Sequence, residues 1–215
     1  MSPSSSKHLE TEVKFLLSDL TQFRQHLIDA GAELISPKIY EKNLRYDTPW
    51  QSLKLQGKLL RLRQDRAVSL TFKGPAQEAA NSEVRVREEL EVNASDFDTL
   101  AGILERIGLE PVQVYEKYRE TYEMENVEIV IDQMPFGDFV ELEGEERDIK
   151  KTAGQLGLDW RERILANYLS LMAKAKDFYQ LTFDDLTFDN FTDLNVSMAE
   201  VIKADKPAHH VERHQ

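Results

Sequence analysis

Charged residues alternate with other residues in five separate segments of this chain, beginning with Glu10, Glu12 and Lys14. Because successive side chains of a strand point to opposite faces, residues two apart share a face and lie roughly 6.5 to 7 Å from each other. Each segment therefore predicts a strand with one charged face and one largely apolar face. The later segments carry Arg61 and Arg63, then Arg85, Arg87, Glu89 and Glu91, then Lys117 and Arg119, and finally Glu141 and Glu143.

The order of the other signals indicates an α+β fold built mostly from sequential antiparallel strands. Helices are expected near residues 19 to 30 and 95 to 107, from about 147 to 156 and from about 160 to 174, and strands fill most of the intervals between residues 8 and 145. A hairpin is expected over residues 58 to 73, with a stop at Gly74-Pro75 and a loop over residues 76 to 82.

Length and composition favour one domain. We assign residues 1–7 to a polar tether, 8–174 to the domain and 175–215 to a C-terminal extension whose end is disordered. A lid over the site, a dimer contact and a plain tail remain open for the extension, and the plain tail is favoured. The sequence leaves the oligomeric state open, a homodimer included.

The charge balance limits the partners. A net charge of -12 argues against nucleic acid, because such binders neutralise phosphates with a basic surface. No stretch approaches the roughly 20 apolar residues that a membrane helix needs, so no membrane association is expected. The absence of cysteine excludes disulfides and thiolate metal sites and makes the cytoplasm the default location.

Half-buried sheets often carry charges on their solvent side, and any single pair has that explanation. The helices, however, need an apolar surface to cover, and the apolar strand faces supply it. The charged faces then turn the other way, and about eight strands can curl until these faces meet across a lumen. We therefore predict an eight-stranded antiparallel barrel, or tunnel, with helices packed on its outside.

The lumen would hold both signs of charge. Its eight cations are Lys14, Arg61, Arg63, Lys73, Arg85, Arg87, Lys117 and Arg119, and its seven carboxylates are Glu10, Glu12, Glu89, Glu91, Asp132, Glu141 and Glu143. Arginines suit oxyanions, and oxygen ligands without cysteine suit Mg²⁺ or Mn²⁺. Cations and a hard metal in one cavity indicate a polyphosphate as the ligand.

Seven motifs in order make the chain resemble the CYTH superfamily of triphosphate tunnel metalloenzymes, which includes class IV adenylyl cyclases, thiamine triphosphatases and inorganic triphosphatases. The motifs are Glu10-Thr11-Glu12-Val13-Lys14, Tyr46-Asp47-Thr48-Pro49, Leu60-Arg61-Leu62-Arg63, Thr71-Phe72-Lys73-Gly74, Arg87-Glu88-Glu89-Leu90-Glu91, Glu116-Lys117-Tyr118-Arg119 and Phe136 to Glu143. The resemblance covers residues 8 to 173.

The resemblance implies roles for individual residues. Phosphate binding falls to Lys14, Arg61, Arg63, Lys73, Arg87, Lys117 and Arg119, whereas Arg85 matches no motif. Metal binding falls to Glu10, Glu12, Glu141 and Glu143, with Asp132 available for a second metal. Lys14, Glu89 and Glu91 are the expected catalytic residues, and the two glutamates either share the second metal or position the attacking water.

Three functions remain open on the sequence. The favoured one is metal-dependent hydrolysis of a small-molecule triphosphate, namely inorganic tripolyphosphate, a nucleoside triphosphate or thiamine triphosphate. The alternative is a class IV adenylyl cyclase that forms cyclic AMP and pyrophosphate from ATP. A non-catalytic polyphosphate or nucleotide binder is disfavoured, because an anion binder gains nothing from seven nearby carboxylates. Tyr46 and Trp50 are candidates to stack on a base, although packing is the commoner role.

Overall fold

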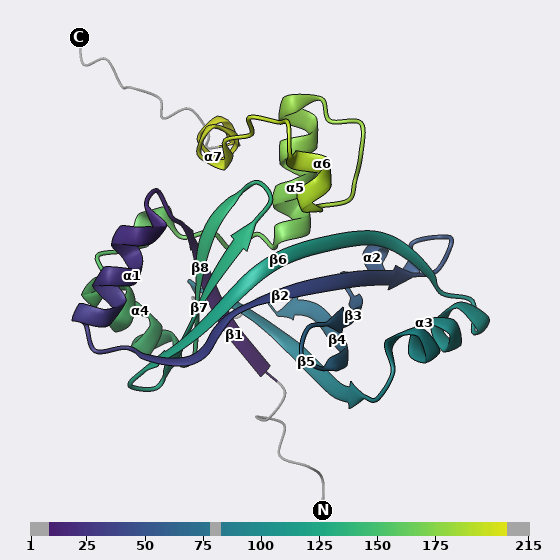
Figure 1. Cartoon of the computed structure of the whole chain (residues 1–215), viewed down its shortest axis with the longest axis horizontal. Coiled ribbons are helices and arrows are strands. Elements are labelled where there is room, and N and C mark those ends of the chain that lie inside the picture. Colours follow the sequence, from purple (N-terminus) through teal and green to yellow (C-terminus); the bar gives the residue numbers. More distant parts are fainter. Residues whose placement is uncertain (1–8, 78–82, 206–215) are drawn as a thin grey trace, which may run out of the picture.

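Eight antiparallel strands form one closed barrel, which confirms the predicted fold class (Figure 1). The computed structural model describes residues 9–77 and 83–205. The strands follow the cyclic order β1-β5-β4-β3-β2-β6-β7-β8. Their bounds are β1 (Leu9–Leu16), β2 (Glu33–Asp47), β3 (Leu59–Gln64), β4 (Val68–Gln77), β5 (Arg85–Ala94), β6 (Glu110–Met124), β7 (Val127–Met134) and β8 (Gly137–Glu143).

The register of the strands turns their charged faces into the barrel. Glu12 of β1 lies opposite Arg85 of β5 and Glu143 of β8, and Lys14 lies opposite Glu141. The residues between them in sequence, such as Val13, point outward and are buried under helices. The prediction that the interior carries the alternating charges is therefore confirmed.

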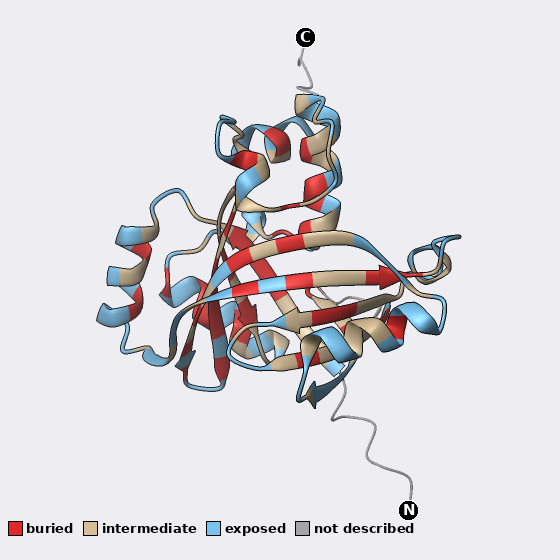
Figure 2. Ribbon diagram, turned by 45° about the vertical axis from the view of Figure 1, so that its right-hand side comes forward, coloured by how far each residue is buried: buried red, intermediate tan, exposed pale blue. Residues whose placement is uncertain are grey.

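Helices cover the outside of the barrel. Their bounds are α1 (Leu20–Asp29), α2 (Ser52–Leu55), α3 (Phe97–Arg106), α4 (Glu146–Gln155), the short 3-10 helix η2 (Trp160–Glu162), α5 (Tyr168–Tyr179), α6 (Phe188–Phe191) and α7 (Met198–Asp205). Figure 2 shows that the buried residues of α1 and α3 face the strands, whereas α7 packs against α5 and α2 has no buried residue. Among the described residues, no helix is both long and apolar enough to cross a membrane.

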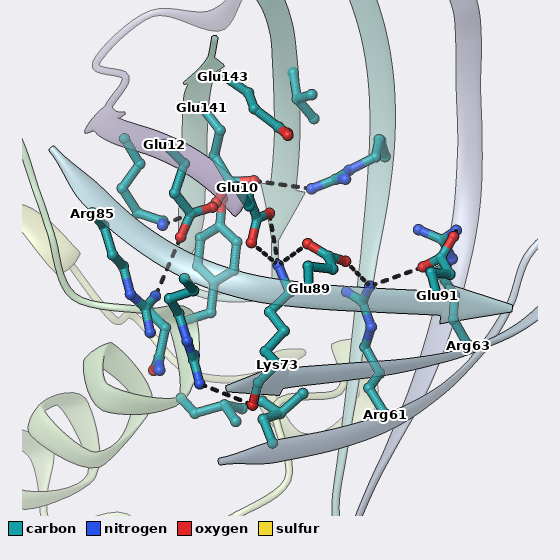
Figure 3. Close-up of a pocket in the computed structure, with 18 of the residues that line it drawn as sticks. Glu10, Glu12, Arg61, Arg63, Lys73, Arg85, Glu89, Glu91, Glu141 and Glu143 are labelled. Atoms are coloured by element: carbon teal, nitrogen blue, oxygen red, sulfur yellow. Dashed lines mark hydrogen bonds and ion pairs between the residues drawn. The ribbon is translucent and has the colours of Figure 1, made fainter. Parts of the chain in front are cut away.

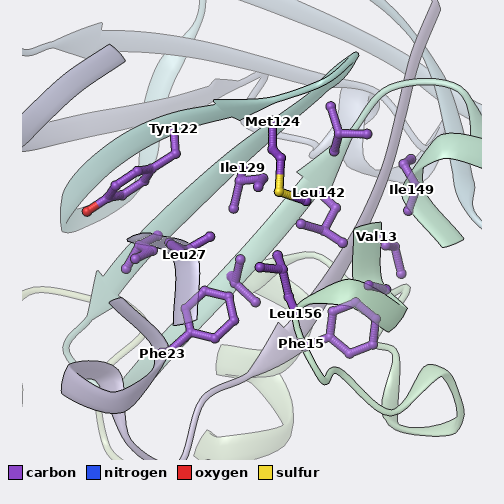
Figure 4. Packing of buried hydrophobic residues seen from close by; sticks show 14 of the residues in the cluster. Val13, Phe15, Phe23, Leu27, Tyr122, Met124, Ile129, Leu142, Ile149 and Leu156 are labelled. Carbon is purple, nitrogen blue, oxygen red and sulfur yellow. The ribbon is translucent and has the colours of Figure 1, made fainter. Parts of the chain in front are cut away.

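Three apolar clusters join helices to the barrel. In the largest, Phe23 and Leu27 of α1 and Ile149 of α4 pack on Val13 and Ile129 (Figure 4). A smaller cluster packs Leu104 of α3 against β2 and β3. The third cluster holds α5, α6 and α7 on residues of β6 and β8 and on the turn between β7 and β8.

The C-terminal segment contributes to the wall of the barrel. On one side of β6, strand β7 pairs only from Tyr118 onward. Next to the preceding residues, Leu186 forms a parallel bridge with Tyr115, donating its amide to the Val114 carbonyl and accepting from the Glu116 amide, both at 2.9 Å. Leu186 is fully buried, so this segment is packed into the fold rather than lying free.

The structure corrects the expected helix over residues 160 to 174. Residues 160–162 form only the turn η2, and α5 begins at Tyr168 because the Asn167 side chain caps it by accepting from the Ser170 amide. Between them Ile164 pairs with Lys14 of β1 through two backbone hydrogen bonds, which keeps this stretch extended.

The expected stop at Gly74-Pro75 is also wrong. Strand β4 continues to Gln77 across a register shift between Lys73 and Ala76. Most of the expected loop (78–82), the N-terminal tether and the expected disordered end (206–215) lie outside the described residues.

We predict that Leu186→Ala destabilises the protein by about 2 to 4 kcal/mol, the usual cost of removing a buried leucine side chain. Leu194→Ala is the matched control, since Leu194 lies in the same segment but is 42% exposed. Urea unfolding followed by circular dichroism measures both. Equal midpoints for the two variants would contradict the integration of this segment into the barrel.

Candidate functional site

One cavity of about 580 Å³ occupies the barrel interior, and all eight of the predicted cations line it (Figure 3). Six of the seven predicted carboxylates line it as well, while Asp132 lies beneath the surface with no exposure. The structure thus brings the predicted site residues together. The lining residues come from β1, β3, β4, β5, β6, β7, β8 and the start of α5.

Lys73 lies between two carboxylates near the centre of the site. Its Nζ is 2.7 Å from Glu10 Oε1 and 3.0 Å from Glu89 Oε2. Burial lowers the pKa of Lys73, but Glu10, Glu12 and Glu89 together raise it above its usual value, so the ammonium stays charged. Burial also raises the pKa of Glu89, yet Lys73 and other neighbours bring it below its usual value, so Glu89 is ionised at neutral pH.

The two arginines of β3 share the carboxylate of Glu91. Arg63 Nη2 lies 3.2 Å from Glu91 Oε1, and Arg61 Nη2 lies 3.6 Å from Oε2. Thr71 links them by donating to Glu91 Oε2 at 2.6 Å and accepting from Arg61 at 3.0 Å. The Arg61 Nε is buried and finds no hydrogen-bond acceptor among the described residues.

Asp132 is fully engaged by its neighbours. Arg119 grips both of its oxygens at 2.8 and 2.7 Å, Lys117 Nζ approaches to 2.9 Å, and the Tyr168 hydroxyl donates from 3.1 Å. The negative charge of Glu141 is likewise balanced by ion pairs with Lys14 at 2.9 Å and Arg119 at 3.0 Å. Although burial raises the pKa of Glu141, these cations hold it well below its usual value.

A second group consists of carboxylates whose charges act on one another. Glu10, Glu12 and Glu143 line one side of the cavity together with Glu128, which the sequence analysis did not single out. Burial and the neighbouring charges of Glu10 and Glu128 raise the pKa of Glu143 to about 8. Burial also raises the pKa of Glu10, against the opposing effect of Lys73. A cation bound among such carboxylates would relieve the repulsion between their charges.

The donor chemistry of this second group fits a hard divalent cation, because it consists of carboxylate oxygens alone. Within residues 9–77 and 83–205, however, no three His, Cys, Asp or Glu side chains are already gathered at metal-binding spacing. Glu10 and Glu12 are instead turned toward Lys73 and Arg85, the latter at 3.2 Å. Side-chain movement is therefore needed before these residues could share one ion.

Arg87 has a structural environment unlike that of the other cations. Its guanidinium donates to the backbone carbonyls of Gly74 at 2.7 Å and Gly57 at 2.8 Å, at the mouth of the cavity. Arg87 therefore tethers the segment before β3 to β4. Tyr46 and Trp50, the candidates for base stacking, do not line the cavity: Tyr46 is buried against α3 and Trp50 is 78% exposed.

Sequence reasoning missed Glu41, which is 1% exposed. Its carboxylate lies 3.5 Å from Lys117 and 3.8 Å from Arg119. Burial raises its pKa, but Lys117, Arg119 and two further arginines lower it to about 2. The alternation of Glu41, Asn43 and Arg45 within a predicted extended stretch was the available signal. Tyr168 also lines the cavity, and the Lys14 ammonium lies over its ring, 4.8 Å from the ring centre.

Together, these features define a closed barrel whose interior cavity is lined by charged side chains of both signs. The sequence profile of the CYTH domain family matches residues 8–174. The chain belongs to the CYTH domain family.

Two curated relatives have names that refer to cyclases. A Methanocaldococcus jannaschii protein provisionally named an adenylate cyclase is 28% identical over 66% of this chain and 81% of its own length. The adenylate cyclase CyaB of Aeromonas hydrophila is 32% identical over 64% of this chain and 72% of its own length.

Solved structures share the fold. A Vibrio parahaemolyticus protein provisionally described as an adenylate cyclase has a TM-score of 0.68 and 23% identity, covering 77% of this chain and 98% of its own. A Hippeastrum protein, provisionally classed as an adenylyl cyclase and described as having a dominant triphosphatase activity, has a TM-score of 0.55 and 18% identity. That match covers 75% of this chain and 94% of the Hippeastrum chain.

We predict that Glu41→Gln destabilises the protein at pH 7 by about 3 kcal/mol, because Lys117 and Arg119 lose a buried partner. The folded pKa of Glu41 is about 2, below the reference value of 4.5, so its contribution is complete above pH 4.5 and is lost as the pH falls toward 2. Urea midpoints of wild type and variant should therefore converge below pH 4.5. Glu33→Gln, on the exposed end of the same strand, is the control, and a gap that persists at low pH would contradict this electrostatic role.

Proposed function

We propose that this protein hydrolyses the terminal phosphoryl group of a triphosphate-containing substrate with the help of Mg²⁺ or Mn²⁺. The observation that carries the proposal is the convergence of eight lysines and arginines from β1, β3, β4, β5 and β6 on one cavity. Planar guanidinium groups and ammonium groups in a confined site bind phosphate oxygens well. Inorganic tripolyphosphate is the simplest substrate for such a site.

The residues proposed to hold the metal are Glu10, Glu12 and Glu143, with Glu128 as a further ligand. Burial raises the pKa of Glu143, and the charges of Glu10, Glu128 and Glu12 raise it further. A divalent cation bound there supplies neutralising charge and polarises a phosphoryl oxygen. Asp132 and Glu141 are better suited to fixing Lys117, Arg119 and Lys14 in place, since those cations already satisfy them.

In this proposal, metal binding by the carboxylates is coupled to phosphate binding by the basic side chains. Lys73 and Arg85 are now paired with Glu10 and Glu12. Once those carboxylates engage a cation, both basic side chains become available to phosphate oxygens. The eight cations and seven carboxylates of the lining nearly cancel, so the substrate and its counter-ion are expected to bind cooperatively.

Glu89 is the residue proposed to orient the attacking water, because it stays ionised beside Lys73. The water oxygen bonds to the terminal phosphorus while the bridging P–O bond breaks, and the bridging oxygen leaves with the electron pair. One water proton passes to Glu89 and then to solvent. Lys73 and Arg61 stabilise the charge that grows on the leaving oxygen.

A class IV adenylyl cyclase is the second candidate, and the names of both curated relatives favour it. In that reaction the ribose 3′-hydroxyl attacks the α-phosphorus and pyrophosphate leaves. The aromatic residues in the described cavity lining are Tyr115 and Tyr168. Both hydroxyls contact ionic side chains, Arg61 and Asp132 respectively, so they serve the charged site rather than a base. This arrangement supports the hydrolase.

We predict that the protein releases orthophosphate from tripolyphosphate, and from ATP more slowly, when Mg²⁺ or Mn²⁺ is present. Ion-exchange chromatography of the products measures this outcome. Cyclic AMP and pyrophosphate as the main products from ATP would instead establish the cyclase. An absence of product from both substrates would contradict either enzyme.

We also predict that Glu12→Gln lowers turnover at least 100-fold at fixed Mg²⁺, because a metal ligand is lost while an amide of the same shape remains. Excess Mg²⁺ should recover part of the rate. The control is Glu105→Gln on the exposed face of α3. Steady-state rates and the unfolding midpoint are measured together, and full activity of a folded Glu12→Gln protein would remove Glu12 from the metal site.

A further inference from the structure

A second cavity, also of about 580 Å³, adjoins the mouth of the barrel. It shares Leu59, Arg85, Arg87, Asn167 and Leu169 with the central cavity, so the two cavities lie next to each other. The second cavity lies where β2 ends and β3, β5 and β6 begin, beside the N-terminal half of α5 (Figure 1). We call this cavity the outer groove.

The outer groove is strongly basic within an acidic molecule. Among the described residues, its lining contains six cations, Arg45, Lys54, Lys58, Arg85, Arg87 and Lys176, and one carboxylate, Asp184. The whole chain carries a net charge of -12, so this surface reverses the overall sign. The central cavity, in contrast, pairs its eight cations with seven carboxylates.

Half of the groove cations lack a carboxylate partner. Arg45 is 3.7 Å from Asp47, Arg85 is 3.2 Å from Glu12, and Lys176 is 2.6 Å from Asp184. For Lys54, Lys58 and Arg87, no ion pair with any carboxylate exists within residues 9–77 and 83–205. Unneutralised cations gathered on a concave surface attract a polyanion.

The chemistry of the lining also indicates what kind of polyanion fits. The described lining contains no aromatic side chain, and its apolar members are aliphatic residues and Met172. Single-stranded nucleic acids are usually held by stacking bases on aromatic rings, and a nucleoside would gain little here. A chain of phosphates without bases matches a lining of lysines, arginines and short aliphatic side chains.

We propose that the outer groove binds the distal part of a linear polyphosphate longer than three phosphates, while its terminal phosphates occupy the central cavity. This inference rests on the proposed hydrolase function and names its substrate class. In the reaction, water adds to the terminal phosphorus and the last bridging P–O bond breaks. The products are orthophosphate and a chain one phosphate shorter, and the proton passes to solvent.

The test compares tripolyphosphate, ATP and a medium-chain polyphosphate on the double variant Lys54→Glu and Lys58→Glu. Both lysines lie at the groove and outside the central cavity. Initial rates with Mg²⁺ should show KM for the long chain rising about tenfold more than KM for tripolyphosphate or ATP. The double variant Lys42→Glu and Lys203→Glu makes the same charge change at exposed positions away from both cavities, and it should leave all three KM values unchanged.

Direct binding in the presence of EDTA separates the groove from catalysis. Wild type should bind the long chain more tightly than tripolyphosphate and with a steeper salt dependence, and the groove variant should lose that difference. If the groove variant loses the same affinity for all three substrates, the proposal is overturned, and the groove acts only by general charge attraction. A loss confined to ATP would assign the groove to the nucleoside. If the long chain binds preferentially but no substrate is hydrolysed, polyphosphate binding by the outer groove is supported and the proposed hydrolase function is contradicted.

Discussion

Pairing of opposite charges inside a closed wall is the interaction on which this architecture depends. Removing an ionised group from water costs several kcal/mol, and Lys14 and Lys117 are each only 2% exposed. Glu141, Asp132 and Glu41 offset that cost because the strand register brings them alongside. A slip of one residue would move every charge to the apolar outer face, so the ionic interior and the helix-covered exterior fix the register jointly.

The strands were predictable because their period-two charge pattern is local. The alternating charges of β1, β3 and β8 indicated strands at these places, and the structure has them. The helices α1 and α3 were predicted as well, and the side chains of Asp19 and Asp96 cap them. The start of α5 was not predictable, because Ile164 is kept extended by backbone pairing with Lys14 from the far end of the sequence. The fold of residues 181–205 likewise depends on the free side of β6, which a single segment cannot reveal.

The alternation of charged residues along each strand predicted which residues belong to the site. It did not predict how these residues divide into two groups. The alternation along the strands predicts that Asp132, Glu141 and Glu143 all face the interior of the barrel. The sequence analysis therefore predicted all three as possible metal ligands. In the folded protein the first two are surrounded by lysine and arginine, whereas Glu143 faces Glu10 and Glu128. That difference arises from neighbours on other strands, and only the three-dimensional register determines it. Glu41 escaped notice because its strand lacks the dense charge pattern of the others.

The bridge between Leu186 and Tyr115 has a consequence for biosynthesis. This wall segment leaves the ribosome only after all eight strands have been made. Until it arrives, the backbone of Val114 to Glu116 presents an unpaired edge, which is the kind of surface that invites association with other chains. The nascent barrel therefore passes through a stage in which its strands exist but its enclosure is incomplete, and safe maturation depends on rapid docking of the late-synthesised helices.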